Sequence, residues 1–254
     1  MHRVIHGVVL RATDTKEADR ILTVLSAEEG RLAVIARGVR KKNNALAAAA
    51  EILTYSEMTV YERNGWTMLA DAVPTEHFFG VRRDIELLAL ASYFAELTES
   101  ASPEDDSATE LLPLFLNALY ALGELGLPRE KVKAAFELRL MCAAGYAPLL
   151  DSCAVCGEED MDGAMFDVMQ GIVRCRECRA DGGGLSMPLD AEALAAMRYV
   201  CGCQPKKLYS FTAPEASLAL MSASCEAFTA AQLERGFSTL DFYKKLQMDD
   251  YDGR

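Results

Sequence analysis

Apolar and polar positions alternate with a period of two along much of the first eighty residues, a pattern that predicts β-strands. Short runs rich in β-branched residues, separated by turn-forming clusters, occupy residues 4–12, 20–27 and 31–38. A fourth run alternates from Ile52 to Tyr61, and Asn64-Gly65 then supplies the residue pair of a tight hairpin turn before a fifth run. This segment is therefore predicted to hold five strands.

A long connection, residues 39–51, separates the third predicted strand from the fourth. Five short strands with one such excursion favour a small closed barrel of the OB (oligonucleotide- and oligosaccharide-binding) type. An SH3-like barrel has a similar number of strands, so the strand count alone leaves that alternative open.

The period of the apolar positions changes to that of a helix from residue 82 onward. In the first helical segment, Ile85, Leu88 and Ala95 lie on one predicted apolar stripe. A later helix lies between Pro128 and Gly145, the residue types expected just before and just after a helix. That helix spans residues 129–144, and the other helices are predicted at residues 107–124, 189–202 and 213–234, with a short amphipathic stretch at 238–247.

Four cysteines between the helical segments have the spacing of a tetrahedral zinc site. Two C-x₂-C pairs, Cys153 with Cys156 and Cys175 with Cys178, are separated by eighteen residues, as in zinc ribbons. Each pair forms a tight turn that directs two sulfurs at one metal ion. A hairpin turning near residues 170–171 is predicted to return the second pair to the first. We expect one structural Zn²⁺ per chain.

Other interpretations of the cysteines are weaker. A dithiol redox site would have one C-x-x-C at the start of a helix after a strand, whereas this chain has two copies at ribbon spacing. Catalytic zinc needs an open coordination position, which four sulfurs would close. Three arginines lie near the second cysteine pair: Arg174, Arg176 and Arg179. We expect them to offset the negative charge of the zinc thiolates, and contact with nucleic acid is the alternative role. The remaining cysteines lie among apolar residues and are expected to be buried free thiols: Cys142, Cys201, Cys203 and Cys225.

Together these segments predict an α+β multi-domain protein. An N-terminal OB-fold β-barrel would be followed by an α-helical domain that carries an inserted four-cysteine zinc ribbon. The predicted boundaries are 1–80 for the barrel, 81–150 for the first helical part, 151–186 for the zinc-binding segment and 187–254 for the last helical part.

Charge is distributed unevenly along this acidic chain of 254 residues. Residues 1–80 hold 10 basic and 10 acidic side chains, whereas residues 81–160 hold 6 basic and 15 acidic ones. Within the neutral first segment four cations fall in six positions: Arg37, Arg40, Lys41 and Lys42. Because salt screens charges over about 8–10 Å, such a local cluster acts on a partner more strongly than the net charge of -12 does.

The composition also limits the place and the kind of activity. No apolar run approaches the roughly 18 residues that span a bilayer, and the N-terminal segment lacks the features of a signal peptide. We therefore expect a cytoplasmic protein, in which eight cysteines would not form a disulfide framework. The three histidines, His2, His6 and His77, have no nucleophile partner in the sequence, and the phosphate-binding and nucleophile-elbow motifs are absent. The sequence therefore predicts no catalytic residues and no enzyme.

Cations beside aromatic rings allow an OB barrel to hold single-stranded nucleic acid, because phosphates pair with the cations and bases stack on the rings. The four clustered cations follow the third predicted strand, where such a barrel has its long loop. Rings on the fourth and fifth predicted strands come from Tyr55, Tyr61 and Trp66. The candidate DNA-binding residues are Arg37, Arg40, Lys41, Lys42, Arg11, Arg63, Tyr55 and Trp66.

Four stretches of the chain resemble the bacterial DNA repair family RecO. "GVVLRATDTKEADRILTVLSAEEGRLAVIARGVRKK" is similar to the family's N-terminal OB-fold signature. "FELRLMCAAGYAPLLDSCAVCG" and "MFDVMQGIVRCREC" are similar to its zinc-binding segment with the preceding helix, and "RGFSTLDFYKKL" is similar to its C-terminal stretch. The chain departs from the family pattern at Asn43-Asn44, where a serine is expected, and in its acidic net charge.

The resemblance implies a recombination mediator that binds single- and double-stranded DNA and anneals complementary strands. It also implies that the protein works with RecR to place RecA on strands coated by single-strand-binding protein (SSB). The helical domain would recognise the acidic, apolar C-terminal tail of SSB, and the protein would act in the nucleoid. An adaptor that assembles repair proteins without acting on DNA is the alternative function, and a nuclease or redox enzyme is a third.

Overall fold

The computed structural model describes the backbone of residues 2–102, 109–178 and 184–252, and the side chains of these residues as far as 248. The chain forms two compact units. The first unit comprises Met1–Gly126 and Phe237–Arg254, and the second comprises Leu127–Gly236. The change from strands to helices near residue 80 therefore falls inside the first unit.

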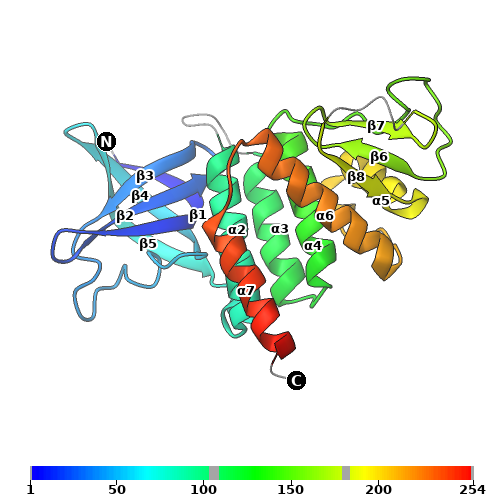
Figure 1. Ribbon diagram of the computed structural model, residues 1–254. Helices are drawn as coiled ribbons and strands as arrows, with labels where there is room; N and C mark the ends of the chain where they lie inside the picture. Colours follow the sequence, from blue (N-terminus) through cyan, green and yellow to red (C-terminus); the bar gives the residue numbers. More distant parts are fainter. Residues whose placement is uncertain (1, 103–108, 179–183, 253–254) are drawn as a thin grey trace. The chain divides into compact units, whose positions relative to one another are not determined.

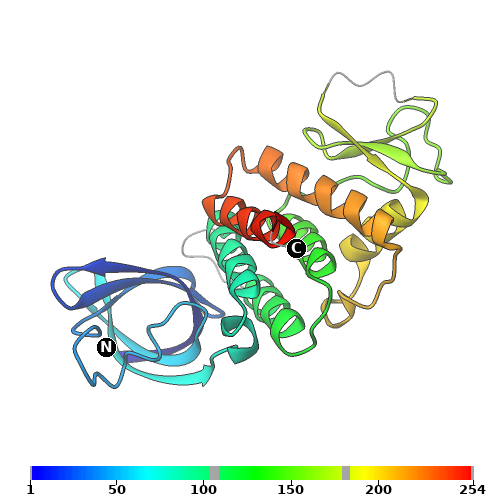
Figure 2. The same cartoon turned by 60° about the horizontal axis from the view of Figure 1, so that its bottom comes forward.

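Five strands of the first unit form a closed barrel (Figure 1). They are β1 (His2–Thr15), β2 (Asp19–Ser26), β3 (Gly30–Ala36), β4 (Tyr55–Arg63) and β5 (Trp66–Glu76). The strand order is β1-β2-β3-β5-β4, and pairing of β4 with β1 closes the ring, which Figure 2 shows from another side. Strands β3 and β5 pair in parallel, and the other neighbours are antiparallel. This order confirms the predicted OB-type barrel.

Alternating side chains of the strands fill the barrel. On β4, Ser56, Met58 and Val60 are fully buried, and the residues between them lie on the outside. The predicted start of this strand at Ile52 is wrong, because Leu53 adopts a φ of +64°, which is incompatible with a strand. The apolar core of the barrel consists of Ile5, Val9, Leu22, Val24, Val34, Ala36, Val39, Ala50, Met58, Val60 and Leu69.

The described helices of the first unit are α1 (Phe79–Arg82), α2 (Ile85–Ala101), α3 (Leu111–Gly123) and α7 (Ser238–Asp252). Asp84 caps α2 by accepting hydrogen bonds from the amides of Glu86 and Leu87. Because β1, α1, α3 and α7 all contact α2, it is buried on several sides from Ala89 onward. The predicted stripe is wrong at Ile85, which is 59% exposed. The short helix α1 was not predicted.

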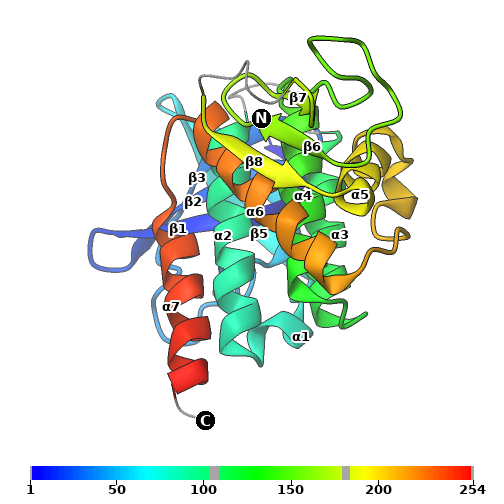
Figure 3. The same cartoon turned by 45° about the vertical axis from the view of Figure 1, so that its right-hand side comes forward.

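The C-terminal helix α7 lies beside α2 (Figure 3). At the start of α7, the hydroxyl of Thr239 donates to the carboxylate of Glu96 on α2. The ring of Phe237 meets that of Tyr93 edge-on, with 5.5 Å between the ring centres. These contacts explain why the last residues belong to the first unit although the whole second unit precedes them in the sequence.

The described part of the second unit combines helices with a small sheet. Its elements are α4 (Arg129–Ala143), β6 (Ala164–Asp167), β7 (Ile172–Cys175), β8 (Ser186–Leu189), α5 (Ala191–Gly202), the 3₁₀-helix η2 (Pro205–Lys207) and α6 (Glu215–Gln232). The sheet is antiparallel, with the order β7-β6-β8. The predicted hairpin is confirmed as β6 and β7, whereas β8 was not predicted. Strand β8 is short and contains Pro188, a residue found in sheets mainly on edge strands such as this one.

A buried charge cluster joins α4 to α6. The ammonium group of Lys133 lies 2.9 Å from carboxylate oxygens of both Glu137 and Glu226. Burial acts to lower the pKa of Lys133, but the two carboxylates outweigh it and raise that pKa to about 12. The lysine is therefore charged, and its pairing offsets the cost of burying the charge.

None of the described helices has the length and apolar character needed to cross a membrane.

Candidate metal centre and nucleic-acid surface

The four cysteines of the two C-x-x-C pairs converge beside the small sheet of the second unit. Cys153 and Cys156 precede β6, Cys175 ends β7, and Cys178 lies in the turn that follows. Their Sγ atoms all lie within 4.8 Å of one another, and those of Cys156 and Cys175 are 3.7 Å apart. Four sulfurs at about 2.3 Å from a metal ion lie about 3.8 Å from one another in a tetrahedron. The cluster therefore fits a single metal ion.

Backbone hydrogen bonds shape both C-x-x-C turns. The amide of Gly157 donates to the carbonyl of Cys153 at 2.9 Å, and the amide of Cys178 donates to the carbonyl of Cys175 at 3.2 Å. Gly157 has a φ of +79°, which glycine adopts without the steric cost of a Cβ. The amide of Cys175 donates to Sγ of Cys153 at 3.3 Å and so joins the two turns. The local backbone holds the ligand positions close together.

The four sulfurs lie too close together to carry four negative charges by themselves. Burial acts to raise the pKa of Cys153, but hydrogen bonds from the amides of Cys156, Cys175 and Val155 hold it at about 6. Contact with the Cys175 thiol, together with burial and the neighbouring Cys156, raises the pKa of Cys178 to about 12. A bound cation would remove this repulsion and let every sulfur act as a thiolate, the form that binds metal.

The arginines near the second pair differ in position. Arg174 is buried, and its guanidinium donates to the carboxylate of Asp167 at 3.0 Å and to the side chain of Gln170 at 3.0 Å. Its charge is therefore neutralised by Asp167, and neither predicted role applies to it. Arg176 is exposed beside the cluster, and Arg179 lies outside the described residues.

Asp167 is a structural residue that the sequence analysis missed. Its carboxylate also accepts hydrogen bonds from the amides of Met169 and Gln170 in the turn between β6 and β7. Aspartate commonly closes turns in this way, so its position a few residues before Gly171 was the available signal. The ion pair with Arg174 could not be read from that signal alone.

A cavity of about 300 Å³ adjoins the cysteine cluster. Cys156 and Cys175 form part of its wall, and Arg176 contributes the cation among its lining residues. Four acidic residues also line it: Glu158, Asp160, Asp162 and Glu177. This excess of negative charge disfavours a nucleic-acid phosphate at Arg176.

The four clustered cations follow β3, on the loop of the barrel that leads to β4. The side chains of Arg37, Arg40, Lys41 and Lys42 are all exposed. Arg40 lies 3.3 Å from the carboxylate of Asp14. The other three form no ion pair with any residue in the described part of the chain. Three positive charges thus face solvent without a carboxylate partner there.

The loop that carries these cations is packed and hydrogen-bonded. The amide of Gly38 donates to the carboxylate of Asp19 at 2.7 Å, which ties the loop to the start of β2. Asn44 donates from its side chain to the carbonyl of Gly38 at 2.9 Å and accepts from the amide of Leu46 at 2.8 Å. Val39 is buried in the barrel core. Asn44 therefore shapes the loop, a role that the sequence analysis did not assign to it.

Trp66 and Arg63 lie at the hairpin between β4 and β5. Both side chains are exposed, Trp66 to 54%, and the two residues face each other across the Asn64-Gly65 turn. Trp66 precedes Thr67, the partner of Val34 in β3. Arg37 follows three residues after Val34 and is therefore offset from Trp66 by four residues, or about 13 Å, along this pair of strands. The exposed ring of Trp66 and the exposed cation of Arg37 thus adjoin the same pair of strands at different heights.

The other predicted DNA contacts have protein partners. Arg11 forms a two-pronged ion pair with Glu99 of α2, the shortest contact being 2.8 Å. Tyr55 is half-buried on β4, and burial together with the nearby charge of Glu28 raises its pKa. Tyr61 also lies on β4, where its ring contacts that of His2. The structure does not bring these three residues together with the basic loop.

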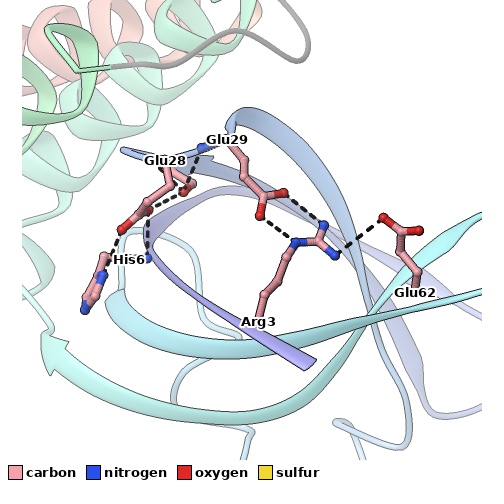
Figure 4. A network of polar contacts seen from close by, with 6 residues as sticks. Arg3, His6, Glu28, Glu29 and Glu62 are labelled. Atoms are coloured by element: carbon pink, nitrogen blue, oxygen red, sulfur yellow. Dashed lines mark hydrogen bonds and ion pairs between the residues drawn. The ribbon is translucent and has the colours of Figure 1, made fainter. Parts of the chain in front are cut away.

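Acidic side chains from the turn between β2 and β3 and from β4 lie around Arg3 and His6 of β1 (Figure 4). Glu29 and Glu62 lie on either side of the guanidinium group of Arg3. His6 contacts Glu28 at 2.9 Å through Nδ1 and Glu57 at 3.4 Å through Nε2. Four carboxylates thus surround one arginine and one histidine. Tyr55 and Tyr61 also lie on β4, whereas Trp66 begins β5.

Sequence comparisons cover both units of the chain. The family described as "Recombination protein O N terminal" matches residues 1–78, and the family described as "Recombination protein O C terminal" matches residues 82–241. The first match spans the barrel, and the second includes the four clustered cysteines.

Curated relatives match over most of their own length. DNA repair protein RecO of Acetivibrio thermocellus is 29% identical over 240 residues, which are 94% of this chain and 95% of the relative. The protein of the same name from Anaeromyxobacter sp. (strain K) is 39% identical over 201 residues, 78% of each chain. That of Heliobacterium modesticaldum is 36% identical over 209 residues, 80% of this chain and 74% of the relative. With a barrel and a cysteine cluster in the matched segments, this chain belongs to the recombination protein O (RecO) family.

Proposed function

We propose that this protein is a DNA-binding recombination mediator in DNA repair, which anneals complementary strands and helps RecR to load RecA onto SSB-coated single-stranded DNA. It acts by binding and not by chemical turnover. The names of the curated relatives support a role in DNA repair. The observation that carries the proposal is the exposed basic loop after β3, in which Arg37, Lys41 and Lys42 have no ion-pair partner within the described ranges.

Charge asymmetry of the barrel defines the expected DNA path. The surroundings of Arg3 and His6 on β1 contain Glu28, Glu29, Glu57 and Glu62 and would repel phosphates. The basic loop and the exposed ring of Trp66 adjoin the β3–β5 pair instead. A single strand would therefore run along β3 and β5, with phosphates on the loop cations and a base on Trp66.

Annealing follows from the same electrostatics. Two complementary strands repel each other through their phosphates, and cations that neutralise these phosphates release counterions and reduce the repulsion. A loop that holds one strand loosely while a second approaches needs no nucleotide fuel. Contacts to phosphates carry no sequence information, so annealing should be independent of sequence.

For the cysteine cluster we propose one structural Zn²⁺ per chain, held by Cys153, Cys156, Cys175 and Cys178. Four thiolates at tetrahedral spacing suit Zn²⁺ and leave no open position for substrate. Elemental analysis of protein purified without chelator should find one zinc per chain. Removal of the ion by a chelator should unfold the segment around β6 and β7, because metal binding and folding are coupled in such sites. Protein without stoichiometric zinc would contradict this assignment.

DNA binding is tested by matched charge removal. Lys41→Ala with Lys42→Ala removes two exposed cations of the loop, and Lys206→Ala with Lys207→Ala removes two exposed cations of the second unit as the control. In fluorescence titrations with single-stranded DNA, each lost phosphate contact should reduce the slope of log affinity against log salt by about 0.7. We expect a reduction of about 1.4 for the loop variant and none for the control. Equal slopes for both variants would remove the loop from the mechanism.

A single substitution refines the test. Arg40 already pairs with Asp14, so Arg40→Ala should reduce the salt slope less than Arg37→Ala does. Asp14→Asn should have the opposite effect on affinity, because it releases Arg40 for phosphate. If Arg40→Ala has the larger effect, the ion pair with Asp14 does not persist in solution.

An adaptor that assembles repair proteins without intrinsic DNA activity is the second candidate. The cavity lined by four acidic residues beside the cysteine cluster favours it, since such a surface suits a basic protein partner better than DNA. Strand annealing by the purified protein alone separates the two functions. A mediator should accelerate annealing without RecR or SSB, whereas an adaptor should leave the rate unchanged.

A further inference from the structure

A pair of cysteine thiols outside the metal centre lies between two helix ends of the second unit. Cys142 is in the last turn of α4 and Cys201 is in the last turn of α5, and their Sγ atoms are 3.6 Å apart. A disulfide has about 2.05 Å between its sulfurs, so an approach of about 1.5 Å would bring them to bonding distance. We propose that Cys142 and Cys201 form a redox-sensitive pair, which a hydroperoxide oxidises to an intramolecular disulfide.

Accessibility distinguishes this pair from the neighbouring thiol. Cys142 and Cys201 are both half-buried, so a molecule as small as a hydroperoxide can reach them. Cys225 lies close enough for its charge to raise the pKa of Cys201, but it is fully buried. Cys203 is also half-buried, and its sulfur faces the carbonyl of Val200 at 3.7 Å. The geometry therefore selects Cys142 and Cys201 from the four cysteines outside the metal centre.

The surroundings assign different roles to the two thiols. Contact with the Cys201 thiol lowers the pKa of Cys142, burial opposes this effect, and the positive charge of Arg139 reinforces it. The same contact raises the pKa of Cys201. The guanidinium of Arg139 is held in place by donating to the carbonyl of Cys201 at 2.8 Å. Since the thiolate is the reactive form, Cys142 is the nucleophile and Cys201 the resolving thiol.

The oxidation balances with one hydroperoxide. The Cys142 thiolate attacks one oxygen of hydrogen peroxide, the O–O bond breaks, and Cys142 becomes a sulfenic acid while the departing hydroxide takes a proton to form water. The sulfur of Cys201 then attacks the sulfur of Cys142, and the S–O bond breaks. The second water leaves with the proton of the Cys201 thiol. Two thiols are oxidised by two electrons in total, and the peroxide is reduced to two waters.

A second metal site is the competing interpretation of this thiol cluster. Within the residues that the structure describes, the group with ligand atoms close enough to hold a metal is Cys153, Cys156, Cys175 and Cys178. Cys142, Cys201 and Cys225 do not form such a group there. The pair near the ends of α4 and α5 is therefore a dithiol and not a ligand set.

The proposed bond would enclose the metal-binding segment. A disulfide from Cys142 to Cys201 closes a loop of about 60 residues that contains all four clustered cysteines and the three-stranded sheet. Chain-entropy estimates for a loop of this length correspond to about a thousand-fold smaller unfolding constant. The oxidised second unit would keep α4 and α5 together even after loss of the metal. In a reducing compartment the pair returns to the dithiol.

Disulfide mapping on the full-length, metal-loaded protein tests the proposal. The protein is treated with a small excess of hydrogen peroxide, alkylated and digested without reduction, and the peptides are identified by mass spectrometry. We expect a cross-linked peptide pair containing Cys142 and Cys201, with the metal retained. Cys203→Ser should form the same cross-link at an unchanged rate. Cys142→Ser should reduce sulfenic acid labelling of this region at least tenfold.

The mapping uses the unaltered chain, so its outcome does not depend on whether a variant folds. Recovery of Cys142 and Cys201 as alkylated thiols, while the four clustered cysteines are oxidised, would overturn the proposal. A cross-link from Cys142 to Cys203 in place of Cys201 would also overturn it.

Discussion

Replacing Asp167 with alanine should weaken metal binding by the four clustered cysteines, although Asp167 is not a ligand. Its buried carboxylate accepts from the guanidinium of Arg174 at 3.0 Å and from the amides of Met169 and Gln170 at 3.1 and 3.0 Å. Alanine would leave the buried Arg174 without a carboxylate and two turn amides without an acceptor. These groups form the hairpin that returns Cys175 to the first pair of ligands.

The magnitude follows from the burial of the ion pair. Only 2% of the side chain of Asp167 and 9% of that of Arg174 are exposed, and removing one partner of a buried pair costs about 3–5 kcal/mol. Because metal binding and folding of this segment are coupled, the cost appears in the apparent metal affinity. At about 1.4 kcal/mol per factor of ten, the affinity should fall by roughly two to three and a half orders of magnitude.

The assay is a competition for Zn²⁺ between the full-length protein and a chromogenic chelator at fixed pH. Asp167→Asn keeps an oxygen for the turn amides but loses the negative charge, so its effect should be smaller than that of alanine. Asp151→Ala removes an exposed carboxylate just before Cys153 and serves as the control, with affinity unchanged. An Asp167→Ala protein that binds zinc within threefold of the unaltered protein would refute the reasoning.

Three further predictions concern the first unit. Contact with Glu28 raises the pKa of His6, while hydrogen bonds from His6 and Ser26 outweigh burial and lower the pKa of Glu28 to about 2. Glu28 therefore adds stability above about pH 4.5, and this stability is lost as the pH falls toward 2. His6 adds stability below about pH 6.5, and this stability is lost as the pH rises through its raised pKa. Thermal unfolding should show both losses, and His6→Gln should abolish the loss at the higher pH. Gly80→Ala would place a Cβ 2.3 Å from the carbonyl oxygen of Gly123. The free energy of unfolding, measured with urea, should therefore fall by about 1–3 kcal/mol. Unchanged stability would mean that α1 and α3 separate freely. Trp66→Ala should weaken single-strand binding by about 1–3 kcal/mol without changing the melting temperature, and a lowered melting temperature with intact binding would contradict a stacking role.

Several features of this protein are determined by the sequence alone, because each depends on neighbouring residues. Alternation and the Asn64-Gly65 turn located the barrel strands to within a few residues, and the two C-x-x-C pairs identified the four cysteines that converge in the structure. The basic loop was also visible, since its cations are contiguous. Local propensity did not reveal α1 or β8, because four positions are too few to show a period. Strands β6 and β7 are equally short, but the Gln170-Gly171 turn and the flanking cysteine pairs marked their hairpin.

Only the tertiary structure decided which side chains face one another. Arg11 and Glu99 are 88 positions apart, and their pairing occupies a cation that the sequence offered to DNA. Ile85 begins an apolar stripe yet faces solvent, because four neighbours arranged around α2 determine which of its faces are buried. Arg174 is likewise neutralised by Asp167, and Cys142 approaches Cys201 across two helix ends. A linear pattern indicates which residues carry charge or sulfur, but folding brings distant segments together and so selects the partners of each.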